Sequence, residues 1–165
     1  MDNNDLLIRV RYALDIKNKD MIEIFKLGGI EVTKDELLKL LTKSSDNEDD
    51  STENEEHIKC DDVMMESFLN GMIIFKRGKQ DPKPGQPERP AYSNERMNNI
   101  LLKKLKIALS LTSEDMLEIL KAAKFTVTKG ELNALLRKEG HKNYKECGDQ
   151  FARNFLKGLA VKYRD

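Results

Sequence analysis

Apolar residues recur at intervals of three and four along most of the chain, which is the spacing of one face of an α-helix. Near the start, Leu6, Leu7, Val10 and Ala13 follow this spacing, while Arg9 falls on another face. Similar apolar series follow one another before the prolines at 82–90 and again after them. The pattern predicts an all-α protein.

The first half of the chain carries four predicted helices. Thr33-Lys34-Asp35-Glu36 has the form of a capping box, which predicts that the third helix begins there. The pair Gly28-Gly29 is expected to end the second helix, because glycine accepts the left-handed backbone that closes a helix. The apolar residues of the second and fourth helices are Met21, Ile22, Ile24, Phe25, and then Val63, Met64, Phe68, Leu69, Met72, Ile73 and Phe75.

The second half repeats the first. The aligned segments are Asn3-Asn4 with Asn98-Asn99, Asp20–Ile24 with Asp115–Ile119, Thr33–Glu36 with Thr128–Glu131, and Phe68–Gly71 with Phe155–Gly158. The displacement is 95 residues (98 − 3) over the first three helices and 87 residues (155 − 68) in the fourth. Such self-similarity indicates two copies of one folding unit. A unit below about 80 residues is near the lower limit for a core of its own, so we expect two tandem, sequence-related four-helix units that pack together.

A glycine occupies the same position inside the fourth helix of each copy, in the motif Phe-Leu-x-Gly. Gly71 and Gly158 each cost a helix about 0.5–1 kcal/mol relative to alanine. The expected compensation is the close approach of another backbone.

Composition divides the chain into three parts. All four prolines lie in the stretch 80–95, which is expected to be an extended linker because proline cannot continue a helix or a strand ladder. The predicted domains are therefore a first repeat at 1–79 and a second at 96–165. Eight extra residues (95 − 87) separate the third and fourth helices of the first repeat, and the acidic stretch 44–59 is predicted to be a loop.

The net charge of zero hides an uneven distribution. Residues 44–62 carry 1 basic and 9 acidic side chains, whereas residues 96–165 carry 15 basic and 8 acidic ones, a net charge of +7. A basic surface favours acidic partners, nucleic acid above all. We therefore expect any working surface on the second repeat.

The candidate contacts lie in and around the second repeat's basic loop. Helices two and three of this repeat resemble a helix-turn-helix, with Met116–Lys124 as the first helix and Thr128–Lys138 as the recognition helix. Tyr144 could stack on a base or instead pin the loop to the core, and the second reading is favoured. The hypothesised nucleic-acid contacts are Lys129, Asn133, Arg137, Lys142, Tyr144 and Lys145.

Motifs for catalysis or cofactor binding are absent. The chain has no glycine-rich phosphate loop, no Gly-x-Ser-x-Gly elbow and no Cys-x-x-Cys pair, so we expect no enzyme and no cofactor. A zinc site would need His57, Cys60, His141 and Cys147 together, and two half-buried thiols at helix starts are the favoured interpretation. No apolar run is long enough to span a membrane and no secretory signal is recognisable, so a cytoplasmic location is expected.

Five segments together resemble a known family. They are Asn-Asn-x-Leu-Leu, Asp-Met-x-Glu-Ile, Val-Thr-Lys-x-Glu-Leu, Gly140-His141-Lys142-Asn143-Tyr144 and Phe155-Leu156-Lys157-Gly158-Leu159. The chain is similar to the YehS family of uncharacterised bacterial proteins, over nearly its whole length and in both copies. The acidic insert at 44–56 departs from the pattern. The resemblance implies a duplicated helical domain in bacteria and no established activity.

Two functions remain open from the sequence. The first is a non-enzymatic binding protein that takes DNA or RNA through the basic second repeat. The alternative is an adaptor that holds a protein partner in a groove between the repeats.

Overall fold

The repeat architecture predicted from the sequence is confirmed. The computed structural model describes residues 1–42, 57–78 and 95–164, and every regular element within them is a helix. The helices are α1 (Asn3–Ala13), α2 (Asn18–Leu27), α3 (Lys34–Leu40), α4 (Asp62–Arg77), α5 (Met97–Ala108), α6 (Ser113–Ala122), α7 (Lys129–Leu136) and α8 (Asp149–Arg164). The acidic run at 44–56 and the proline-rich stretch at 80–94 lie outside the described residues.

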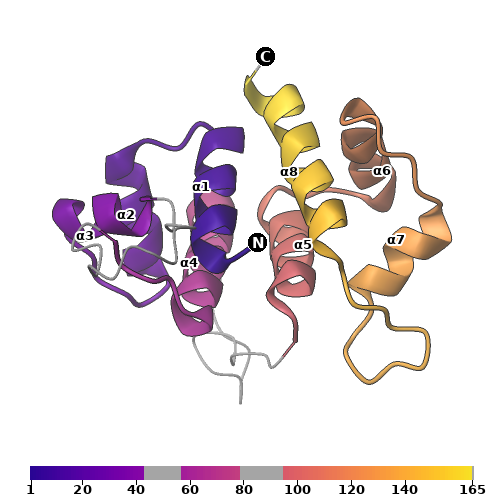
Figure 1. Cartoon of the computed structure of the whole chain (residues 1–165), viewed down its shortest axis with the longest axis horizontal. Helices are drawn as coiled ribbons and strands as arrows, with labels where there is room; N and C mark the ends of the chain where they lie inside the picture. The colour runs from indigo at the N-terminus through magenta and orange to yellow at the C-terminus, as the bar shows by residue number, and fades with distance from the viewer. Residues whose placement is uncertain (43–56, 79–94, 165) are drawn as a thin grey trace, which may run out of the picture.

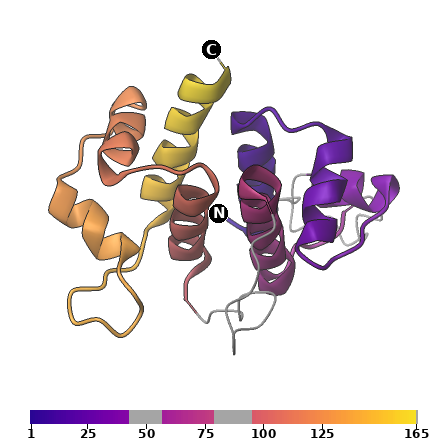
Figure 2. The same ribbon diagram turned by 180° about the vertical axis from the view of Figure 1, so that it is seen from behind.

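Four helices form the centre of the molecule. Figures 1 and 2 show α1 and α4 of the first repeat side by side with α5 and α8 of the second. The contacts between the repeats are made mainly by α4 on α5 and by α1 on α8. α2 and α3 flank one side of this centre, and α6 and α7 flank the other (Figure 1). The expectation that the two units pack on each other therefore holds.

The two contacts between the repeats are equivalent. Arg77 at the end of α4 donates from Nη1 to the Ile107 carbonyl of α5 at 3.4 Å. Arg164 at the end of α8 donates from Nη1 to the Tyr12 carbonyl of α1 at 2.8 Å. These pairs are related by the displacements of the repeat, 87 residues for the arginines (164 − 77) and 95 for the acceptors (107 − 12). The repeats thus meet about a pseudo-twofold axis.

A buried asparagine on α1 holds the first repeat together. Asn4 is 1% exposed, and its Nδ2 donates to the carbonyls of Leu40 at 2.9 Å and Ile58 at 2.8 Å. Its Oδ1 accepts from the backbone N–H of Cys60 at 2.9 Å. One side chain therefore satisfies the backbone at the end of α3 and along the segment that enters α4. Buried backbone groups without such partners would be costly.

The second repeat contains the same asparagine. Asn99 donates from Nδ2 to the carbonyls of Leu135 at 3.1 Å and Lys145 at 3.0 Å, and its Oδ1 accepts from the Cys147 N–H at 2.8 Å. The neighbouring asparagine also has a repeated role, because Asn3 and Asn98 donate to Asp62 and Asp149 at the starts of α4 and α8. The Asn-Asn pair of each copy fixes where its fourth helix begins.

The two cysteines lie beside these asparagines. Cys60 and Cys147 are free and almost wholly buried, so the prediction of half-buried thiols was wrong. Burial is the main cause that raises the pKa of each thiol to about 12. Both thiols are therefore neutral packing groups, because the reactive thiolate is suppressed.

The capping box and the helix-ending glycine of the first repeat were predicted correctly, whereas the capping box of the second repeat was not. Thr33 and Glu36 form the expected capping box, and Gly29 has the left-handed φ of 98° after α2. In the second repeat, the Thr128 hydroxyl accepts from the Glu131 N–H, but the Glu131 carboxylate accepts from that hydroxyl instead of the cap N–H. The second predicted capping box is therefore incomplete.

The close backbone approach expected at the Phe-Leu-x-Gly glycines is present. A Cβ added at Gly71 would lie 1.9 Å from the Ile24 carbonyl oxygen of α2. A Cβ added at Gly158 would lie 1.9 Å from the Ile119 carbonyl oxygen of α6. In each repeat the second and fourth helices touch backbone to backbone, which offsets the conformational cost of glycine.

The contact at Gly158 gives a first prediction. Gly158→Ala should destabilise the protein by more than about 2 kcal/mol, because the new methyl group would overlap backbone that can move only with α6. The matched control is Gly130→Ala on α7, where an added Cβ meets nothing closer than 3.9 Å. The control should leave the urea midpoint unchanged or raise it slightly. Equal midpoints for the two variants would contradict this account.

Removal of the buried amide gives a second prediction. Asn99→Ala should lower the free energy of unfolding by at least about 2 kcal/mol, since it leaves two carbonyls and one N–H without partners. Asn143→Ala, an exposed asparagine in the loop before α8, should change it by less than about 0.5 kcal/mol. Equilibrium urea denaturation measures both. A loss below about 1 kcal/mol for Asn99→Ala would show that water replaces the amide.

A cationic groove between the repeats as the candidate site

The residues predicted to bind nucleic acid at α7 are partly occupied by local contacts. Lys129 donates to Glu114 Oε1 at 2.7 Å, and this bond is the main cause that lowers the pKa of Glu114. α7 ends at Leu136, so the predicted helix through Lys138 is too long and Arg137 lies beyond its end. Asn133 and Arg137 are half-buried. The positions named for a recognition helix therefore present little free charge.

The loop before α8 is fastened to the core. Tyr144 is half-buried, with the Lys103 ammonium 5.4 Å from its ring centroid. Desolvation, followed by the charge of Glu95, raises the pKa of Tyr144 to about 12. The backbone N–H of Lys145 donates to the Ala134 carbonyl, and the Lys145 carbonyl accepts from Asn99. The side chains of Lys142 and Lys145 are exposed. Tyr144 thus packs against the body of the second repeat, in agreement with the favoured interpretation that it fastens the loop.

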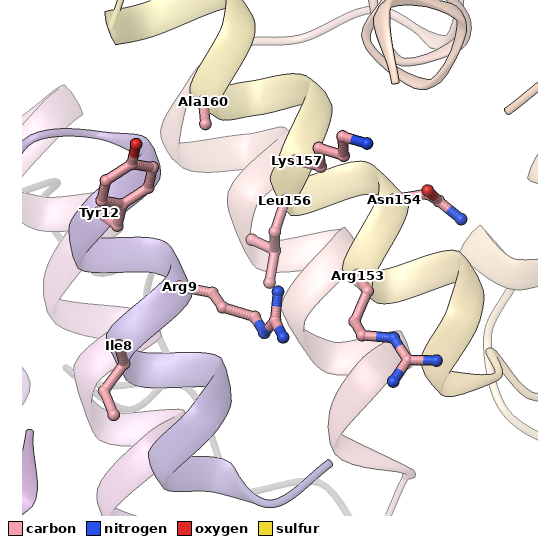
Figure 3. A pocket seen from close by; sticks show the side chains of 8 residues that line it. All are labelled: Ile8, Arg9, Tyr12, Arg153, Asn154, Leu156, Lys157 and Ala160. Carbon is pink, nitrogen blue, oxygen red and sulfur yellow. The ribbon is translucent and has the colours of Figure 1, made fainter. Parts of the chain in front are cut away.

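A groove of about 490 Å³ lies elsewhere, between α1 and α8. Figure 3 shows side chains from both helices around it. The lining residues are Ile8, Arg9 and Tyr12 of α1 and Arg153, Asn154, Leu156, Lys157 and Ala160 of α8. Three of them are cations and none is acidic. The groove therefore combines apolar walls with positive charge.

The positive charge of the groove is available to a ligand. Arg9, Arg153 and Lys157 are exposed, and among the described residues none of them takes part in an ion pair. Arg153 and Lys157 are four residues apart on α8, so they lie on one face of the helix. Arg9 comes from the opposite wall (Figure 3). An anion in the groove can therefore be bound from both repeats.

An aromatic ring stands beside these cations. Tyr12 is 59% exposed, and the Arg164 guanidinium carbon lies 4.1 Å from its ring centroid. Arg164 is held there by its bonds to the Tyr12 carbonyl and to Asp15 Oδ1, the latter at 3.3 Å. The ring of Tyr12 is thus fixed on one side and open to solvent elsewhere.

The equivalent contact between α4 and α5 contains an acidic residue, which the groove between α1 and α8 lacks. Lys104 corresponds to Arg9 (104 − 9 = 95), and Glu66 corresponds to Arg153 (153 − 66 = 87). Glu66 is 2% exposed. Burial lowers the pKa of Lys104, and the charge of Glu66 acts in the opposite direction. Opposite charges therefore attract across α4 and α5, whereas like charges face the groove between α1 and α8.

Both ends of the groove are tied. At one end the amino group of Met1 donates to Asp149 Oδ2 at 2.9 Å. Hydrogen bonds from Asn98 and from this amino group lower the pKa of Asp149 to about 2, so its carboxylate is charged at neutral pH. At the other end Arg164 bonds to the Tyr12 carbonyl. These contacts hold α1 beside α8 although the cations between them repel.

Sequence reasoning missed Arg9, Arg153 and Lys157 as a site. The available signal was the alignment of the two copies, in which Glu66 is exchanged for Arg153 at an otherwise shared position. That signal becomes interpretable only when α1 and α8 are known to be neighbours. Within the described parts of the chain, no group of three or more His, Cys, Asp or Glu residues could hold a metal ion, and no helix could cross a membrane.

Comparison with known proteins confirms the resemblance seen in the sequence. A family model described as "Protein of unknown function (DUF1456)" matches residues 3–78 and again residues 98–165. The chain belongs to this family. The matched segments fall on the two repeats. "Uncharacterized protein YehS" from Escherichia coli (strain K12) is 43% identical over 163 residues, which are 98% of this chain and 96% of that relative. No solved structure matches the chain.

The charge difference between the two contacts gives a third prediction. Arg153→Glu places a carboxylate on the wall opposite Arg9, as Glu66 stands opposite Lys104, and should raise the free energy of unfolding by up to about 1 kcal/mol. The double variant with Arg9→Glu brings two carboxylates together and should lose this gain. Thermal unfolding at low salt measures the pair as a double-mutant cycle. Equal free energies of unfolding for the single and the double variant would contradict the expected attraction.

Proposed function

We propose that the chain is a non-enzymatic nucleic-acid-binding protein whose main phosphate contacts are Arg9, Arg153 and Lys157. The observation that carries the proposal is the convergence of three cations, without an acidic partner, on one groove between the repeats. Arginine binds phosphate oxygens through two parallel hydrogen bonds, and lysine adds a mobile point charge. A phosphate in the groove would relieve the repulsion between the two walls.

The surroundings of the groove favour a polyanion over a single small anion. α8 belongs to the second repeat, which carries the net charge of +7 (15 − 8) over residues 96–165. The exposed side chains of Lys142 and Lys145, predicted from the sequence, add attraction that does not depend on base sequence. Lys129 is a weaker candidate because Glu114 already bonds to it. Arg137, Asn133 and Tyr144 contribute mainly to the loop and the core.

The lining of the groove supports binding without catalysis. None of its residues is Ser, Cys, His, Asp or Glu, the usual nucleophiles and general bases. The buried thiols of Cys60 and Cys147 stay protonated at neutral pH. The groups that face a ligand can therefore orient and neutralise it.

The same groove is where a protein partner would bind if the chain is an adaptor. The partly exposed apolar residues of its walls, Ile8 and Ala160, favour this second function because a partner helix could lay an apolar face on them. Such a partner would have to bring acidic residues to Arg9 and Arg153. Capture of one stoichiometric protein that survives nuclease treatment would support the adaptor over nucleic acid.

Charge removal in the groove gives a fourth prediction. Arg9→Gln, Arg153→Gln and Lys157→Gln should each weaken binding of a fluorescein-labelled oligonucleotide, and the slope of log affinity against log salt should fall by about 0.7–0.9 per lost phosphate contact. Lys26→Gln on α2, exposed and outside the groove, should change neither quantity. Fluorescence anisotropy over a salt series measures both.

Two results would count against this proposal. Absence of binding to DNA and RNA at low salt would end it. Binding that is insensitive to all three groove variants but lost in Lys142→Gln or Lys145→Gln would move the contact surface to the loop before α8. Unfolding curves of the variants check that each one is folded.

A further inference from the structure

We propose that the groove between α1 and α8 takes a single nucleic-acid strand, with a phosphate between Arg9 and Arg153 and a base against the ring of Tyr12. This inference rests on the proposed function and goes beyond it, because it names the form of nucleic acid that is bound. It depends on three observations: the groove has an open aromatic ring, it has apolar walls between the cations, and the ring and the free cations are both missing from the equivalent contact.

The first feature is the exposed ring of Tyr12. Solvent reaches 59% of this residue although it lines the groove. The Arg164 guanidinium lies against the ring at 4.1 Å and is itself held by Asp15 and by the Tyr12 carbonyl. A fixed aromatic ring is a platform for an unpaired base, since every base has a face that stacks. The bases of a duplex already stack on one another and offer no such face.

The second feature is the apolar wall between the cations. Ile8 and Tyr12 are one turn apart on α1, and Leu156 and Ala160 are one turn apart on α8 (Figure 3). A sugar or base edge can cover this wall while the phosphate is held by Arg9, Arg153 and Lys157. The volume of about 490 Å³ is that of a small-ligand site, which suits a nucleotide-sized unit. A duplex would reach the cations at the rim and leave the wall exposed.

The third feature is the contrast with the contact between α4 and α5. The position of Tyr12 is occupied there by Ile107 (107 − 12 = 95), and the position of Lys157 by Asn70 (157 − 70 = 87). Glu66 replaces Arg153 and is buried. Both contacts keep the hydrogen bond from the last arginine of the fourth helix, Arg77 or Arg164, to a carbonyl of the other repeat. Ring and free cations therefore occur together at one contact and are both missing from the other.

The experiment compares two probes and two substitutions at one residue. The probes are a labelled oligothymidylate and a labelled duplex of the same length, measured by anisotropy at low salt. We expect the wild-type protein to bind the single strand more tightly. Tyr12→Leu should weaken single-strand binding by about tenfold, the loss of one base–aromatic stack, and leave duplex binding unchanged. Tyr12→Phe, which keeps the ring, should retain the wild-type affinity.

The outcomes separate this inference from the proposed function. Equal affinity for both probes, with no effect of Tyr12→Leu on either and a loss for both in Arg153→Gln, would overturn the single-strand inference and leave nucleic-acid binding in place. No binding of either probe would overturn both. Tyr163→Leu, an exposed tyrosine of α8 outside the groove lining, is the matched control and should behave as wild type.

Discussion

The architecture depends on one buried side-chain amide in each repeat. Asn4 and Asn99 satisfy backbone groups at the end of the third helix and before the fourth, where no helix supplies partners. Because the fourth helix starts from this point, the amide sets the position of α4 and α8. Those two helices make most of the contact between the repeats together with α5 and α1. A polar contact inside each unit therefore determines how the units meet and where the groove lies.

Duplication gives a pseudo-twofold interface, and a difference in charge makes its two halves unlike. Glu66 and Lys104 attract each other across the half formed by α4 and α5, whereas Arg9 and Arg153 lie on opposite walls of the groove in the other half. The framework is shared, since Arg77 and Arg164 donate to equivalent carbonyls. Two copies with one core can thus carry an attractive charge pair on one side and a cationic groove on the other, without any change of fold.

The parts of the fold that depend on residues close together in the sequence could be predicted from it. Helix periodicity, the Thr33 capping box and the repeated Gly71 and Gly158 all describe contacts that follow from spacing along one or two helices. The sequence showed Asn4 and Asn99 only as residues shared by the two copies. Their hydrogen-bond partners could not be predicted, because a polar residue on an apolar helix face does not indicate which backbone groups it contacts. The groove was missed because Arg9 and Arg153 are 144 residues apart (153 − 9) and meet only when the repeats pack. Net charge pointed to the second repeat, but it could not show that Glu114 already bonds to Lys129.

The same packing also holds the two walls of the groove together at both ends. α1 and α8 are joined at one end by Met1 and Asp149 and at the other by Arg164 and the Tyr12 carbonyl. These contacts oppose the repulsion between the cations on the two walls. Two walls that are already held in place would require little conformational ordering from a bound group, and such ordering is a main penalty of binding to flexible surfaces. The cations of the two walls repel each other, and this repulsion would destabilise a pair of helices without further contacts. Here polar contacts at the two ends of the groove oppose the repulsion, and a bound anion would remove it.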